Sequence, residues 1–175
     1  MADHLDYCLP QKLVDQARLV IDANRRAGLR IAVAESCTGG LVSAALTEIP
    51  GSSDVFDAGL VTYANDAKLN LLKVSPDVLD TFGAVSVAVA WAMAQGTLAK
   101  TGADTAVAIT GVAGPEGGSD KKPVGTVVFA RARRGADPDE IVADRREFGN
   151  LGRGGVRLQA ALCALELLMP VDGSS

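Results

Sequence analysis

Residues 31–46 constrain the fold most, because they predict a strand, a tight turn and a helix in direct succession. The run IAVAE at 31–35 is apolar and β-prone, and apolar residues recur at helical spacing over 40–48. Between the two lies SCTGG, whose small residues suit a sharp turn. A strand joined this closely to a helix is typical of α/β proteins.

The rest of the chain continues this alternation and ends on two successive strands. Further strands are expected over 55–63, 104–110, 125–133 and 141–148, and helices over 11–27, 67–73, 86–100, after Pro76 and after the glycine cluster 149–155. The turn residues Gly135–Pro138 favour an antiparallel pairing of the last two strands, whereas the earlier strands fit βα units. The prediction is a single three-layer αβα domain of the α/β class, with a mixed parallel and antiparallel sheet.

Composition and charge limit the size and the partners of this domain. The 175 residues are 48% hydrophobic, which suits one domain over 11–170, with a mobile segment at 1–10 and a disordered tail at 171–175. The net charge of -4 argues against a broad nucleic-acid surface. Because no run is long and apolar enough for a membrane span or a signal peptide, we expect a cytoplasmic protein without a membrane partner.

Cysteine and histidine are too sparse for several common kinds of site. Three cysteines lie far apart at positions 8, 37 and 163, and His4 is the single histidine, so neither a disulfide framework nor a zinc site is expected. The same count disfavours a Ser-His-Asp triad. A serine nucleophile in this chain would therefore need another base, and lysine and tyrosine are the usual replacements.

Ser36 is the candidate nucleophile. The turn can leave its hydroxyl at the carboxyl edge of the sheet, where backbone N–H groups of Cys37, Thr38, Gly39 and Gly40 could hold an oxyanion or a phosphate. The alternative from this stretch alone is that Ser36 or Thr38 merely caps the following helix.

Two glycine-rich segments are candidate ligand loops. The irregular stretch 111–124 permits close backbone approach to a ligand and does not fit a Walker A loop. The segment GNLGRGG at 149–155 joins a strand to a helix and contains Arg153, whose guanidinium suits phosphate or carboxylate. Its spacing is not that of a dinucleotide fingerprint, and for both segments flexibility alone is an equally good interpretation.

Several ordered motifs together resemble one family. They are AESCTGG (34–40), PGSSDVF (50–56), VTYANDAK (61–68), GAVS (83–86), ITGVAGPEGG (109–118) and KPVGTV (122–127). These stretches look like the CinA C-terminal domain family, the nicotinamide-nucleotide amidohydrolases. The resemblance implies hydrolysis of the amide of nicotinamide mononucleotide to nicotinate mononucleotide and ammonia, in pyridine-nucleotide recycling. It implies no metal and no organic cofactor.

The resemblance also implies roles for particular residues. The family's nucleophile falls on Ser36, its tyrosine on Tyr63 and its lysine on Lys68. Its hydroxyl residue falls on Thr110, followed by Gly111 in the loop that would position nicotinamide or ribose. Its phosphate-binding arginine falls on Arg153, with Arg157 as the rival, because the local pattern differs from the family's more usual acidic neighbours.

The expected mechanism is attack of Ser36 on the carboxamide carbon, with Lys68 and Tyr63 moving the proton and an acyl-enzyme then cleaved by water. Lys68 must be neutral to act as a base, and a place in the first turn of a helix would lower its pKa.

Two other functions stay open. One is a non-catalytic nucleotide-binding module in competence or DNA-damage regulation, and the other is an amidase for another small amide. The resemblance and the apolar helix faces also favour a homodimer.

Overall fold

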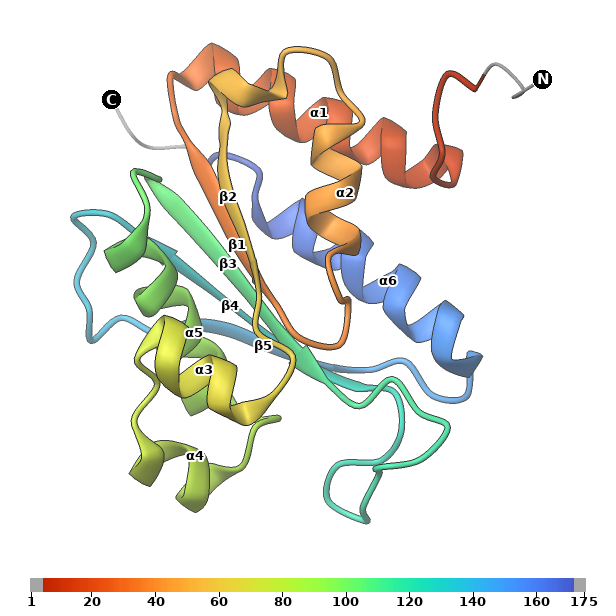
Figure 1. Ribbon diagram of the computed structural model, residues 1–175, viewed down its shortest axis with the longest axis vertical. Coiled ribbons are helices and arrows are strands. Elements are labelled where there is room, and N and C mark those ends of the chain that lie inside the picture. Colours follow the sequence, from red (N-terminus) through yellow and green to blue (C-terminus); the bar gives the residue numbers. More distant parts are fainter. Residues whose placement is uncertain (1–4, 172–175) are drawn as a thin grey trace.

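The computed structural model describes residues 5–171 and shows a three-layer α/β arrangement (Figure 1). The sheet contains β1 (Ile31–Glu35), β2 (Phe56–Val61), β3 (Thr105–Gly111), β4 (Thr126–Arg133) and β5 (Val142–Glu147). The helices are α1 (Gln11–Ala27), α2 (Leu41–Thr47), α3 (Asn65–Leu72), α4 (Pro76–Phe82), α5 (Val87–Lys100) and α6 (Gly152–Leu167), with a short 3₁₀ turn at Ser52–Asp54.

The strands form one mixed sheet in the order β2-β1-β3-β4-β5. β1 runs parallel to β2 and β3, whereas β4 and β5 pair antiparallel, as the late pair of strand-like runs predicts. The predicted α/β class, three layers and mixed sheet are confirmed. β1 therefore lies between β2, which precedes the α3–α5 segment, and β3, which follows it.

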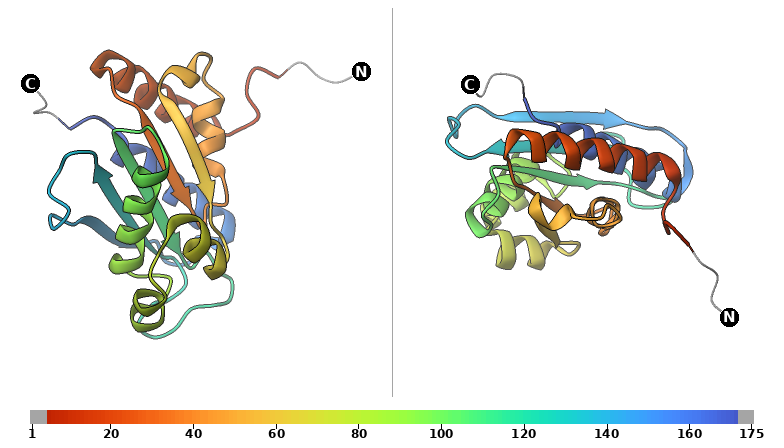
Figure 2. Two further views of the ribbon diagram at one scale, coloured as in Figure 1. Left: turned by 60° about the vertical axis from the view of Figure 1, so that its left-hand side comes forward. Right: turned by 90° about the horizontal axis from the view of Figure 1, so that it is seen from above.

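The two faces of the sheet carry different side chains. Val33, Val107, Ile109 and Phe129 point to the face covered by α1, α2 and α6. The opposite face of these strands is mostly alanine and packs against α5 (Figure 2, left). Small residues allow a helix backbone to lie close to a sheet, so the alanines bring α5 and its neighbours near the strand ends.

One glycine lets α3 approach α5. A Cβ added to Gly96 would lie 2.1 Å from the carbonyl oxygen of Leu72, which is closer than atoms can pack. α3 therefore lies directly against α5, and this contact fixes the helix that carries Lys68.

Three parallel strands end at the same edge of the sheet. β1 ends at Glu35, β2 at Val61 and β3 at Gly111, and Glu35 is in register with Val61 and Ile109. The connections that leave β1 and β2 turn to opposite faces, so this edge is a topological switch point, where α/β proteins commonly bind ligands.

Some local expectations need correction. α3 begins at Asn65, earlier than expected, and its N-cap is Ala64, which makes no side-chain cap. Asn65 and Asp66, residue types that often cap helices, both lie inside the first turn of α3. β2 ends before Tyr63, which belongs to the connection.

The chain ends were expected to be mobile, and residues 1–4 and 172–175 lie outside the described part. Within 5–10, Tyr7 and Leu9 pack against the core, and Cys8 donates its N–H to Glu48. In the described residues, no helix is long and apolar enough to cross a membrane.

Candidate active site

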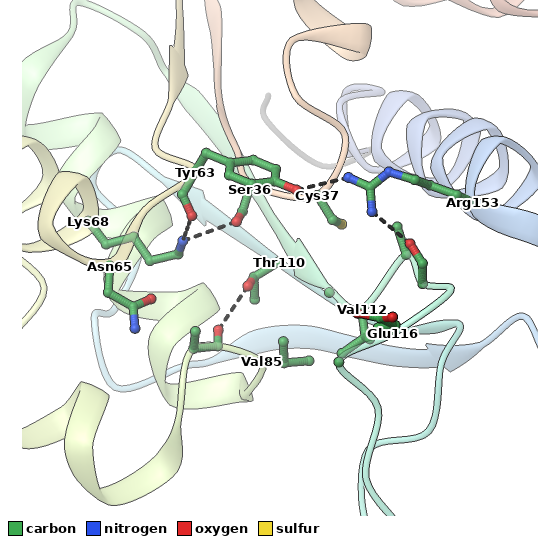
Figure 3. Close-up of a pocket in the computed structure, with 15 residues that line it drawn as sticks. Ser36, Cys37, Tyr63, Asn65, Lys68, Val85, Thr110, Val112, Glu116 and Arg153 are labelled. Atoms are coloured by element: carbon green, nitrogen blue, oxygen red, sulfur yellow. Dashed lines mark hydrogen bonds between the residues drawn. The ribbon is translucent and has the colours of Figure 1, made fainter.

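Ser36 lies at the first position after β1 and faces a cavity at the strand ends (Figure 3). Its backbone N–H donates to the carbonyl oxygen of Ile109 at 2.9 Å, which extends the β1–β3 pairing by one residue. The turn then begins with a bond from the N–H of Gly39 to the carbonyl oxygen of Ser36 at 3.0 Å. The backbone of Ser36 is thus held on both sides while its hydroxyl stays at the sheet edge.

Glu35 caps α2, a role that the sequence analysis did not assign. Its fully buried carboxylate accepts bonds from the N–H groups of Gly40, Val42 and Ser43 at 2.8–3.1 Å, and from the Ser43 hydroxyl at 2.7 Å. A carboxylate at a helix N-terminus satisfies unpaired N–H groups and opposes the positive end of the helix dipole. The alternative in which Ser36 or Thr38 caps this helix is therefore wrong.

Because of this cap, fewer backbone N–H groups than expected are free to hold an oxyanion. The N–H groups of Gly39 and Gly40 already donate to Ser36 and Glu35, so these two glycines have no free donor to offer a ligand. Gly40 instead adopts a φ of 97°, a left-handed conformation that glycine favours, and this lets the turn enter α2. In residues 5–171 the N–H groups of Cys37 and Thr38 have no acceptor. Of the two residues, Cys37 lines the cavity and Thr38 does not.

Replacing Glu35 with alanine is expected to lower the free energy of unfolding by about 3 kcal/mol, because it leaves several buried N–H groups without acceptors. Glu35→Gln keeps one acceptor oxygen and should lose less. Urea unfolding of both variants beside Glu48→Ala, which removes a half-buried glutamate at the other end of α2 that accepts the single backbone N–H of Cys8, measures the difference. Equal stability of the Glu35→Ala and Glu48→Ala variants would contradict the capping role.

Lys68 is buried, with 1% of its surface exposed, and its amine lies against the Ser36 hydroxyl. Nζ lies 3.0 Å from Oγ of Ser36 and donates to the carbonyl oxygens of Thr62 at 2.8 Å and Tyr63 at 3.0 Å. No carboxylate forms an ion pair with it among residues 5–171. Burial lowers the pKa of Lys68 below its ordinary value of 10.5. The predicted lowering is confirmed in direction, and burial is its main cause.

The hydroxyl of Tyr63 forms no hydrogen bond with Ser36 or Lys68. It accepts a hydrogen bond from Nη2 of Arg153 at 2.9 Å, across the mouth of the cavity (Figure 3). The structure shows no hydrogen bond along which the expected proton relay through this hydroxyl would run: the phenol is turned toward Arg153, and Tyr63 is bonded to Lys68 through its backbone carbonyl.

Arg153 and Arg157 lie on successive turns of α6 and have different surroundings. Arg153 lines the cavity and donates from Nη1 to the carbonyl oxygen of Gly114 at 2.7 Å. Arg157 donates to the carbonyl oxygens of Cys37 and Thr38 at 3.2 and 2.9 Å, and so holds the turn after Ser36. It is absent from the residues that line the cavity.

Thr110 and Gly111 form the floor of the cavity at the end of β3. The Thr110 hydroxyl donates to the carbonyl oxygen of Ala84 at 2.8 Å, which draws the α4–α5 connection against β3. A Cβ on Gly111 would lie 2.8 Å from the carbonyl oxygen of Thr126, so only glycine fits beside β4 there.

The cavity has a volume of about 280 Å³ and gathers most of the candidate residues. It brings together Ser36, Cys37, Tyr63, Lys68, Thr110, Gly111 and Arg153, and does not include Thr38, Gly39 or Gly40. Asn65 and Glu116 also line it and were not singled out as site residues. Their place inside VTYANDAK and ITGVAGPEGG, motifs that carry the other site residues, was the available signal.

Cys37 is adjacent to Ser36 but poorly suited to nucleophilic attack. Burial raises the pKa of its thiol to about 11, so little thiolate forms at neutral pH. In the described part of the chain, no group of three or more His, Cys, Asp or Glu side chains is placed to hold a metal ion.

Comparison with known proteins identifies one matching family and several similar proteins. The model of the CinA C-terminal domain matches residues 14–171. The chain is 46% identical to the nicotinamide-nucleotide amidohydrolase PncC of Enterobacter agglomerans, over 90% of this chain and 94% of that protein. It is 50% identical, over 81% of its length, to a Symbiobacterium thermophilum protein described as competence-damage inducible, and spans 34% of that longer relative.

The structural comparison agrees. The crystal structure of the competence/damage inducible protein CihA from Agrobacterium tumefaciens superposes with a TM-score of 0.87 at 46% identity. The match covers 91% of this chain and 95% of that one. Both the sequence and the fold are therefore similar to proteins described as competence- or damage-inducible.

Proposed function

The chain belongs to the CinA C-terminal domain family, and from this we propose that it hydrolyses the carboxamide of nicotinamide mononucleotide to nicotinate mononucleotide and ammonia. The Enterobacter relative, matched over almost its whole length, carries the name of that activity. Amidohydrolase chemistry also suits a cavity that holds a hydroxyl against a buried amine.

The observation that carries the proposal is the direct contact between Lys68 and Ser36. A neutral amine has two N–H groups and one lone pair. Because Nζ donates to the carbonyl oxygens of Thr62 and Tyr63, its lone pair is left for the third neighbour, the Ser36 hydroxyl. Burial without a carboxylate partner favours that neutral form.

We propose the following steps. Oγ of Ser36 attacks the carboxamide carbon while Lys68 takes the hydroxyl proton, giving a tetrahedral oxyanion. Lys68 then returns the proton to the departing nitrogen, the C–N bond breaks, and ammonia leaves an ester on Ser36. A water molecule, deprotonated by Lys68, attacks the ester and releases the carboxylate and the serine hydroxyl.

The oxyanion would be held near the start of the turn. The N–H group of Cys37 is the available donor at the cavity, since those of Gly39 and Gly40 are engaged. Arg157 contributes indirectly, because its bonds to the Cys37 and Thr38 carbonyls fix the orientation of these peptide units.

Arg153 is proposed to bind the phosphate, and Arg153→Met is expected to raise the KM for the mononucleotide by about 10- to 100-fold, the cost of a lost charge-assisted hydrogen bond. kcat should change less, because the phosphate is remote from the reacting carbon. Steady-state kinetics beside Arg146→Met, a change at an exposed arginine of β5, measures the effect. An unchanged KM in the Arg153 variant would assign the phosphate to another group.

The substrate is tested by comparing kcat/KM for ammonia release from nicotinamide mononucleotide, free nicotinamide, the dinucleotide NAD and simple amides. The proposal predicts a clear preference for the mononucleotide, with nicotinate mononucleotide formed in equal amount. A preference for another amide would retain the Ser36–Lys68 chemistry and reject the substrate. The homodimer, the cytoplasmic location, the lack of a nucleic-acid partner and the absence of a cofactor stay predictions.

A further inference from the structure

Glu116 is the one acidic side chain among the residues that line the cavity. It lies on the loop after β3, on the side of the cavity away from Lys68 (Figure 3). Arg153 contributes the opposite charge from the start of α6 and donates to the backbone of the same loop at Gly114. The outer part of the cavity thus presents one carboxylate and one guanidinium.

The carboxylate of Glu116 has no partner in the described chain. No hydrogen bond or ion pair joins it to any residue within 5–171. Arg153, the guanidinium that lines the cavity, donates to Gly114 and Tyr63, and Lys122, which follows Glu116 in the same loop, donates to the carbonyl oxygen of Phe82 at 2.8 Å. An acidic group beside an anion-binding arginine would weaken the binding of a purely anionic ligand. Its presence favours a ligand that carries a positive charge as well.

The proposed substrate has this pair of charges. In nicotinamide mononucleotide the ring nitrogen is bonded to the ribose, so the ring is a pyridinium cation, while the other end carries a phosphate. Free nicotinamide has neither charge. A cavity with Arg153 at one point of its rim and Glu116 at another matches a cationic ring joined to an anionic tail.

Resting on the proposed function, we propose that Glu116 is a specificity-determining residue, whose carboxylate pairs with the positive charge of the pyridinium ring. Arg153 pairs with the phosphate. Selection of the mononucleotide over the neutral base then comes from two separate charges of the ligand, each recognised by one residue. The competing role for Glu116 is acceptance of hydrogen bonds from the ribose hydroxyls, which does not depend on the ring charge.

Reduced nicotinamide mononucleotide separates these roles, because its dihydropyridine ring is neutral while its ribose and phosphate are unchanged. Binding of both forms is measured by calorimetry in Ser36→Ala protein, with and without Glu116→Gln. We expect Glu116→Gln to weaken the oxidised mononucleotide about tenfold, as for a partly screened charge pair. The reduced form should bind within about twofold of its original affinity. In the chain with Ser36 intact, kcat/KM for the mononucleotide should fall by the same tenfold factor.

Asp120→Asn is the matched control, because it removes an exposed acid of the same loop that does not line the cavity. It should leave both affinities unchanged. An equal loss for the oxidised and reduced forms in Glu116→Gln would overturn the inference in favour of ribose contacts, and no loss for either would overturn it outright. If the protein with Glu116 intact bound neither form and released no ammonia, the proposed function itself would fail.

Discussion

Replacing Lys68 with methionine is expected to lower kcat/KM for ammonia release from nicotinamide mononucleotide by about 10⁴-fold, the upper range for loss of a general base. Methionine fills a similar volume but cannot take the proton of Ser36. The chain should stay folded, because a buried amine is replaced by a side chain that tolerates burial. Kinetics and circular dichroism on the same preparation measure both expectations.

Lys100→Met is the control for loss of a lysine, since Lys100 lies exposed in the last turn of α5. It should retain full activity. Activity of Lys68→Met within tenfold of the parent would remove Lys68 as the base. Loss of the folded structure would instead show that the amine holds the Thr62 and Tyr63 carbonyls in place, and Lys68→Arg, which keeps donors but not a neutral amine, then separates the two roles.

The lowered pKa of Lys68 also gives the pH dependence a direction. The rate should rise with pH as the buried amine loses its proton, at a pH below 10.5. Between the folded and unfolded pKa values the unfolded chain binds more protons, so the free energy of unfolding should also rise with pH across that interval. Both pH dependences should vanish in Lys68→Met. A rate that falls over this interval would mean that the protonated amine is the active form.

Ser36→Ala is expected to abolish turnover, with a loss of about 10⁴- to 10⁶-fold, as for other serine nucleophiles. Only the hydroxyl is removed, and Arg153 is left in place to bind the phosphate. The dissociation constant for the mononucleotide should therefore change only a few-fold. Rapid-mixing kinetics and calorimetry measure turnover and binding separately.

Cys37→Ala is the control at the neighbouring residue, because the Cys37 thiol is buried and its pKa is raised. It should retain activity within about tenfold, since its backbone N–H is kept. If Ser36→Ala retained turnover and Cys37→Ala lost it, Cys37 and not Ser36 would be the nucleophile. Loss of mononucleotide binding in Ser36→Ala would show that the hydroxyl serves the ligand and not only the reaction.

The sequence was sufficient for the elements and the fold class because the apolar periodicity is strong. The strand at 31–35 and the helices at 11–27 and 86–100 follow from buried runs and clear end signals. Strand order was out of reach, since it depends on contacts between segments far apart in the chain. The start of α3 was misplaced because Asn and Asp are good caps in general. Here the N-cap is Ala64, and the helix begins without a side-chain cap.

Most members of the cavity's candidate residues were predictable from the sequence, but Asn65 and Glu116 were missed and the geometry was less predictable. Ser36, Lys68 and Arg153 stand at strand and helix ends that the sequence identifies. The cap formed by Glu35 was not predictable from the sequence. Its carboxylate bonds across the following turn, and the shape of this turn depends on two left-handed glycines. The hydrogen bond between Tyr63 and Arg153 joins residues 90 positions apart, so only the tertiary structure shows it.

The most direct test of the central claim is ammonia release from nicotinamide mononucleotide by the purified chain, in the presence of a metal chelator and with binding monitored in the same sample. We expect mononucleotide-dependent release of ammonia that persists with the chelator. Bound mononucleotide without any release of ammonia would contradict it and would support a nucleotide-binding module.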